Sequence, residues 1–398
     1  MKKLICFILP IATMLGQINY TGSIKPGNMY RLSNQSEISL PFRLAEAEVG
    51  YSLGDFEIKT NSALEYRWSN NENEFQLREA YLMWYPSWGE VKAGKQIHAW
   101  GAVDGNNPTD NLNPYDYYYM FLPGAERKVG TVSGSVKYYW NNWQFEGVFI
   151  PEHEGNRFPF GETAFPLDIP MSAPELISVE PGSEFGFRIQ STLRSSDFSL
   201  SYLDGRDRSF SYVGMTDSMP SFFYRNTSVL GFDLVSFIGG FTNRFEVGYF
   251  STENDAESDV KTLNDGSYIQ FAGQVEYLTE NDIMFSLQII GSEILQIDGT
   301  TTEDEFQPGM GTPFASFTDL GFSISLSANY FADVLEFMGN TFIDLKDSQS
   351  MLGVSAKYSP MDNWKLNLSI SKFMGEEGTQ FHNMEDFSHL KAGLEYHF

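Results

Sequence analysis

The C-terminal ten residues, 389–398, alternate strictly between apolar and polar positions. The apolar positions are Leu390, Ala392, Leu394, Tyr396 and Phe398, and the others are His389, Lys391, Gly393, Glu395 and His397. Because successive residues of a strand point to opposite faces, the pattern predicts a strand with one apolar and one polar face. Such a strand suits the closing strand of a membrane barrel, although a soluble β-sandwich can also contain one.

The same alternation recurs along the chain in long runs. Residues 56–68 place Glu57, Lys59, Asn61, Glu65 and Arg67 on one face and mostly apolar side chains on the other. A run of this length exceeds the usual strand of about 5–6 residues. Further runs cover residues 184–192, 241–251, 267–278, 283–291, 321–331, 335–344, 351–358 and 364–373. A helical period of comparable length is absent from the sequence after residue 16.

The connections between these runs alternate between short and long. Tight turns rich in Gly, Pro, Asn and Asp are predicted at residues 52–55, 86–89, 141–142, 194–196, 279–281 and 359–363. Longer polar segments cover residues 98–126, 151–182, 205–226, 252–266, 292–312 and 374–388. Short turns at one rim and long loops at the other are typical of outer-membrane barrels, with turns in the periplasm and loops outside.

The predicted fold is therefore an all-β, transmembrane, antiparallel up-and-down β-barrel. The strand count should be even, and we expect about 18, with about 16 as the alternative. The two least certain strands are residues 20–32 and 227–235, and losing both would leave the smaller number. An exported soluble β-sandwich or propeller is the competing fold.

The N-terminus predicts export. Lys2 and Lys3 precede an apolar run over residues 4–15, which is shorter than the about 20 residues that span a bilayer. We expect residues 1–16 to be a cleaved signal peptide and residues 17–398 to be a single barrel domain. Cleavage would remove Cys6, the chain's one cysteine. The mature protein would then depend on its hydrogen-bonded architecture rather than on disulfides.

Composition agrees with a barrel and excludes other classes. The chain has 34 Phe and 21 Tyr, and its mean hydropathy of -0.28 fits a barrel in which only every second residue faces lipid. No segment after the N-terminal run has about 18 consecutive apolar residues, which argues against a transmembrane helix. With 52 acidic and 26 basic residues, nucleic-acid binding is not expected, because phosphates require a basic surface.

One segment, residues 78–116, carries a more specific pattern. Its residues Gly94, Lys95, Gln96, Trp100, Gly101, Asp104, Gly105, Pro108, Thr109, Asp110, Asn113, Pro114 and Asp116 resemble a signature of porin-like outer-membrane barrel families. The resemblance is strong over about 40 residues and elsewhere is one of architecture. It implies a barrel in the cell outer membrane of a Gram-negative bacterium. The resemblance is more informative about fold and location than about which solute the barrel passes.

The same segment predicts an ordered loop. Its glycines and prolines force turns, and Asp104, Asp110 and Asp116 are placed to hydrogen-bond the local backbone. An aromatic run follows it, consisting of Tyr117, Tyr118, Tyr119 and Phe121. One hypothesis is that the loop folds inward, narrows the pore and presents Trp100 and the tyrosines to solute. The alternative is that it caps the rim or joins the outer aromatic girdle.

Neither a metal site nor another cofactor is predicted. Asp104 and the residues after it do not match a calcium loop, because Pro108 occupies the fifth position. On the predicted lumen face, Glu57, Lys59, Glu65 and Arg67 have Gln76 and Arg78 on the next strand, so a mixed-sign ladder or an ordinary hydrated wall is expected. A run of basic residues suited to a phosphate-selective pore is missing. Net charge favours cations or neutral solutes.

The predicted function is a porin that passes small solutes passively. The first alternative is a carrier of hydrophobic compounds, lined by Trp100, Phe121 and loop residues such as Phe158. The second is a barrel hydrolase, although no histidine lies in a known catalytic motif, so we do not predict an enzyme. Expected partners are outer-membrane lipid, lipopolysaccharide and the barrel-assembly machinery, which would recognise Tyr396 and Phe398. A homo-oligomer is compatible with the pattern.

Overall fold

The computed structural model describes residues 17–122, 124–166, 172–178, 182–217, 219–254, 260–261, 264–299, 306–316 and 318–398. The predicted signal peptide lies outside these residues. Within them, none of the helices has both the length and the apolar character needed to cross a membrane.

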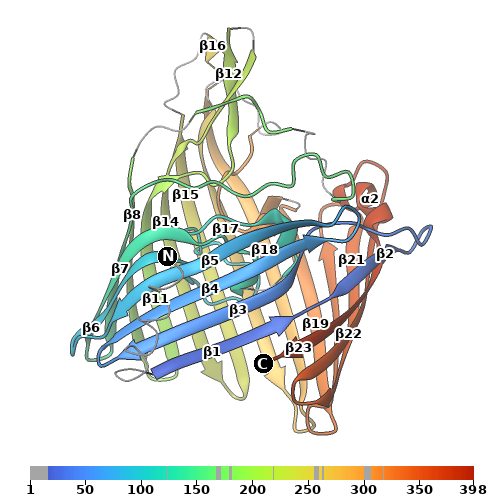
Figure 1. Ribbon diagram of the computed structural model, residues 1–398. Coiled ribbons are helices and arrows are strands. Elements are labelled where there is room, and N and C mark those ends of the chain that lie inside the picture. The colour runs from blue at the N-terminus through green and yellow to red at the C-terminus, as the bar shows by residue number, and fades with distance from the viewer. Residues whose placement is uncertain are drawn as a thin grey trace, which may run out of the picture.

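Strands that cross the molecule 18 times form one closed antiparallel barrel (Figure 1). The sheet has 19 strands, but β1 (Gln17–Ile24) and β2 (Gly27–Arg31) are two parts of one crossing, interrupted at Pro26. Both parts pair with the last strand, β23 (His389–His397), and β1 also pairs with β3, which closes the ring. The other crossings are β3 (Phe42–Leu53), β4 (Phe56–Arg67), β5 (Glu72–Trp84), β6 (Gly89–Gln96), β7 (Thr131–Trp140), β8 (Trp143–Ile150), β10 (Glu184–Leu193), β11 (Ser196–Arg206), β14 (Asn226–Ile238), β15 (Phe241–Glu253), β17 (Asn264–Leu278), β18 (Ile283–Gly299), β19 (Leu320–Tyr330), β20 (Leu335–Asp344), β21 (Gln349–Met361) and β22 (Trp364–Gly375).

The expected strand number and topology are confirmed. Both uncertain strands are present, residues 20–32 as β1 and β2 and residues 227–235 within β14, so the smaller count is wrong. Two-residue turns join β3 to β4, β7 to β8 and β10 to β11. Asn141 and Arg194 adopt positive φ values of 53° and 57° in two of these turns, as tight hairpins require. A closed ring also excludes the soluble sandwich and the propeller.

The outer face is apolar. Trp364 and Leu366 pair with Tyr396 and Leu394 across β22 and β23, while Lys365 pairs with Glu395 on the inner face. The predicted faces of residues 389–398 are therefore confirmed. Contacting aromatic rings also follow the rim near the short turns, namely Phe56, Trp84, Trp88, Tyr138, Phe145, Trp143 and Phe198. Aromatic girdles of this kind mark the boundary between lipid and water.

The long connections carry the remaining elements. A second sheet consists of β9 (Leu176–Ser178), β12 (Ser211–Thr216), β13 (Met219–Phe223) and β16 (Val260–Lys261). The labelled strands β12 and β16 extend beyond the barrel at the top of Figure 1. The short helix α2 (Gln380–Asn383) and the 3-10 turns Tyr117–Tyr119, Gly124–Arg127, Pro313–Ser316 and Glu385–Phe387 lie in other connections.

Candidate functional site

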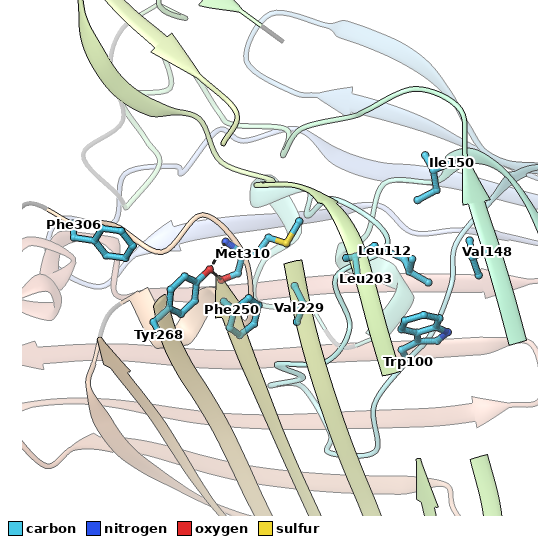
Figure 2. Close-up of a cluster of buried hydrophobic side chains, with 10 residues drawn as sticks. All are labelled: Trp100, Leu112, Val148, Ile150, Leu203, Val229, Phe250, Tyr268, Phe306 and Met310. Carbon is cyan, nitrogen blue, oxygen red and sulfur yellow. Dashed lines mark hydrogen bonds between the residues drawn. The ribbon is translucent and has the colours of Figure 1, made fainter. Parts of the chain in front are cut away.

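The connection between β6 and β7, residues 97–130, is here named the inner segment; all of it except residue 123 is described. Trp100 and Leu112 from this segment belong to a buried apolar cluster with wall residues such as Val148 and Leu203 (Figure 2). Trp100 is only 4% exposed, and its Nε1 donates to Glu146 at 3.2 Å. The expectation that Trp100 is presented to solute is therefore wrong, because its ring attaches the segment to the wall.

Glu246 on β15 is the main polar contact of the inner segment. Its neighbours Phe245 and Val247 belong to the outer face, so its side chain points into the barrel, where it is 0% exposed. Its carboxylate accepts hydrogen bonds from the backbone N–H of Val103 at 2.5 Å, from Thr109 Oγ1 at 2.9 Å and from the backbone N–H of Ala102. Each of these buried donors would cost free energy if it had no acceptor.

Asp104 lies at the tip of the segment, farther across the interior. Its backbone N–H donates to Gln274 Oε1 at 2.8 Å, and its carbonyl accepts from Gln288 Nε2 at 2.8 Å. Arg244 Nη1 donates to the Asp104 carboxylate at 3.1 Å, yet that side chain is 69% exposed. The segment therefore reaches β15, β17 and β18, and Asp104 presents a carboxylate to the lumen.

The other two predicted aspartates are buried. Asp110 forms an ion pair with Lys128 at 3.6 Å, and Lys128 Nζ also donates to the Asp110 carbonyl at 2.7 Å. Asp116 accepts from the backbone N–H of Tyr118 at 3.2 Å. The predicted bond to the local backbone is thus confirmed for Asp116. The carboxylates of Asp104 and Asp110 instead form ion pairs, with Arg244 and Lys128 respectively.

A charged network holds the middle of the segment. Arg157 donates to both oxygens of Glu65, at 2.9 Å and 2.8 Å, and to Asp116 at 2.9 Å. Tyr119 donates its hydroxyl to Glu65, and the Arg43 guanidinium lies 3.9 Å from the Tyr119 ring centre. Burial raises the pKa of the Asp116 carboxyl, and Arg157 opposes that rise. Arg157 is thus the cation that makes this burial of two carboxylates tolerable.

The aromatic run divides between support and surface. Tyr119 is buried, whereas Tyr117 and Tyr118 are half-buried against Phe158 and Glu162, respectively. Burial raises the pKa of Tyr117 to about 12, so its phenol stays neutral at ordinary pH. Phe121 is 39% exposed. Its ring contacts Phe314, Phe373 and Phe387.

Of the predicted wall residues, five have polar partners without forming one ladder, namely Glu57, Lys59, Glu65, Arg67 and Arg78. Glu57 accepts from the Tyr85 hydroxyl at 3.1 Å, and Lys59 pairs with Glu48 at 2.9 Å. Arg67 instead bonds Glu162 of a long loop at 2.9 Å. A register shift in β5 between Glu79 and Leu77 leaves Arg78 unpaired in the strand ladder, and its side chain donates to the carbonyl of Ala125 at 2.8 Å.

A buried Ser–His pair occurs at the start of the segment. His98 Nε2 lies 3.0 Å from Ser133 Oγ, and both side chains are buried. Burial, with smaller contributions from Lys92 and Lys137, lowers the pKa of His98 to about 3. An imidazole with so low a pKa is a poor general base at neutral pH, which argues against hydrolysis here.

Sequence reasoning missed several contact residues. Glu246 lies in the alternating run 241–251, but no neighbouring residue indicates that it accepts hydrogen bonds from the inner segment. Arg157 and Gln274 were not singled out, because their partners lie far away in the sequence. Arg208 likewise pairs with Glu184 at 2.6 Å and donates to the carbonyl of Leu112 at 3.1 Å.

Comparisons with known proteins agree on the fold. No protein-family model and no curated protein matches the chain. Among solved structures, the chain is similar to the outer membrane protein OpdK of Pseudomonas aeruginosa (8% identity, 96% of this chain and 99% of that chain, TM-score 0.56). It is also similar to OccK5 (OpdH) of the same species (9%, 96% and 97%, 0.57) and to a BenF-like porin from Pseudomonas fluorescens (10%, 96% and 98%, 0.54). The chain therefore shares the fold of these proteins.

Proposed function

We propose that this protein is an outer-membrane channel for the passive diffusion of small solutes, with the inner segment as its constriction. The contacts of Glu246 carry the proposal, because a wall carboxylate holds the segment across the lumen. The apolar outer face and the aromatic rim support a place in lipid. The structural neighbours, described as outer membrane proteins and a porin, support the outer membrane in particular.

Three attachments make the constriction rigid rather than a mobile lid. Glu246 binds the first half of the segment, Arg157 binds the middle through Asp116, and Phe121 packs against the opposite wall near Phe373. Each attachment uses partners from a different part of the barrel. The surface left to solute includes the carboxylate of Asp104 and the ring of Phe121.

The charges of the interior favour weak selectivity. Arg43, Arg157, Arg188, Arg208 and Arg225 each form an ion pair with a carboxylate. Paired charges attract a passing ion less strongly than free ones, because their fields largely cancel beyond a few ångströms. We infer a channel that discriminates by size and hydrogen bonding more than by charge.

Liposome swelling tests the proposal against the carrier alternative. The purified full-length barrel is reconstituted, and swelling rates are measured with glycerol and with sugars of increasing size. A water-filled channel gives rates that fall smoothly with solute size. Absence of swelling, together with uptake of a fatty or aromatic compound into the same liposomes, would contradict the channel and support the hydrophobic carrier.

A further inference from the structure

The inner face of β19 to β22 carries hydroxyl and amide side chains in two rows. Strand register places Ser325, Asn340, Gly353 and Ser371 in the upper row. The lower row consists of Ser327, Met338, Ser355, Ser369 and Lys391 of β23. The outer face of the same strands carries exposed apolar side chains such as Ile324 and Leu326, so the serines point into the lumen.

These hydroxyls are free to bind a solute. The five serines are partly exposed, and none of their side chains is hydrogen-bonded to another residue that the structure describes. The nearest charged side chains on these strands, Glu336 and Lys357, form an ion pair with each other at 3.2 Å. This wall therefore offers several neutral donors and acceptors, with Lys391 as a further donor at one end.

An exposed aromatic ring lies at the head of the rows. Phe373 is the next inward side chain of β22 after Ser371, and Phe342 is the next inward side chain of β20 after Asn340. Phe121 packs against Phe373 with ring centres 6.0 Å apart and is supported by Phe387 at 6.5 Å. Phe373 and Phe387 are buried, so Phe121 supplies the ring surface that a solute can touch.

We propose that the channel takes saccharides as its preferred solutes and guides them along this wall. The inference rests on the proposed channel function and names the solute class of the same site. A pyranose has C–H groups that pack against an aromatic ring, and its edge carries hydroxyls that donate and accept hydrogen bonds. Phe121 meets the first requirement, and the rows of serine and asparagine below it meet the second.

Single-channel recording with maltotriose tests the inference. The full-length barrel is placed in a planar bilayer, and interruptions of the ion current by maltotriose are compared with those caused by an oligoethylene glycol of similar size. The glycol has ether oxygens but lacks sugar rings and a set of hydroxyl donors. We expect resolved interruptions with maltotriose and none of comparable duration with the glycol.

Two variants assign the contacts. Phe121→Ala should shorten the maltotriose interruptions about fivefold, as loss of one aromatic contact predicts. The matched control is Phe331→Ala, which removes a ring that is 79% exposed at a short turn. Ser325→Ala combined with Ser369→Ala should shorten the interruptions about threefold. Its control is Ser350→Ala, because Ser350 pairs with outward Ile343.

The outcomes separate this inference from the proposed function. A barrel that passes ions but is interrupted equally by maltotriose and the glycol would overturn the saccharide assignment and leave the channel intact. Unchanged interruptions in both Phe121→Ala and the serine variant would also overturn it. A folded barrel that conducts no ions would overturn the channel and this inference together.

Discussion

Gly101 lies so close to Glu246 that a methyl group on Gly101 would be 2.7 Å and 2.8 Å from the two carboxylate oxygens. Gly101 also has a φ of +92°, which side chains rarely tolerate. The glycine thereby allows the next two residues, Ala102 and Val103, to direct their N–H groups at the carboxylate. Gly101 in the inner segment and Glu246 on β15, which lies 145 positions later, are thus sterically matched.

Gly101→Ala should release the segment from Glu246. The added methyl group both clashes with the carboxylate and strains a positive φ, so we expect a larger and less steady single-channel conductance. Gly105→Ala is the matched control, because Gly105 has a φ of +84° and nothing within 4 Å of an added methyl group. Equal conductance in the two variants would mean that contact with Glu246 does not hold the segment.

Glu246→Gln tests the two acceptor oxygens of this side chain. The amide has one acceptor oxygen in place of two, and its NH2 group would face backbone donors. We expect the free energy of unfolding to fall by about 2–3 kcal/mol, with increased conductance. Glu253→Gln, at the exposed end of the same strand, should leave both quantities unchanged. A Glu246→Gln barrel with wild-type stability and conductance would show that the second acceptor oxygen is dispensable.

His98 should make the barrel sensitive to acid. Its folded-state pKa of about 3 lies below the ordinary value of 6.5. The stability that neutral His98 supports is therefore fully present above pH 6.5. The free energy of unfolding then falls as pH drops from 6.5 toward 3, because the unfolded chain binds a proton that the folded barrel does not. At pH 5 the loss relative to pH 7.5 should be about 2 kcal/mol in unfolding free energy.

His98→Gln should remove this part of the pH dependence, because glutamine does not titrate. His382→Gln, on the exposed helix α2, is the control and should retain it. Unfolding free energies at pH 7.5 and pH 5 are the measurement. If His98→Gln keeps the full wild-type loss at pH 5, the buried imidazole is not its source.

The terminal aromatic residue should matter for assembly. The backbone N–H and carbonyl of Phe398 both bond Gly22, each at 2.9 Å, and its ring lies 6.3 Å from that of Tyr396. Deleting Phe398 removes these bonds and the predicted recognition signal, so most of the chain should fail to reach the folded, heat-modifiable form in outer-membrane fractions. Phe331→Ala is the control. Normal amounts of folded barrel after the deletion would refute the assembly signal.

Much of the fold follows from local pattern. The period of two in a strand predicts that Leu390 and Lys391 lie on opposite faces, and the register with β22 places them there. The strand number follows from the same alternation and from loop lengths, both of which depend on neighbouring residues alone.

The site depends on contacts between residues far apart in the sequence, which no local sequence pattern reveals. Trp100 and Phe121 are both aromatic residues of one segment, yet Trp100 is buried and Phe121 is exposed. The difference comes from the walls that they meet, β8 for Trp100 and β22 for Phe121. The register shift at Arg78 was equally hidden, because a bulge changes pairing without changing composition.

The central claim is that the inner segment narrows a water-filled barrel. Its most direct test is the single-channel conductance of a variant that lacks residues 101–119, compared with the wild type, after heat modifiability shows that both barrels are folded. We expect a clearly larger conductance for the deletion variant. An unchanged conductance in the folded variant would contradict it.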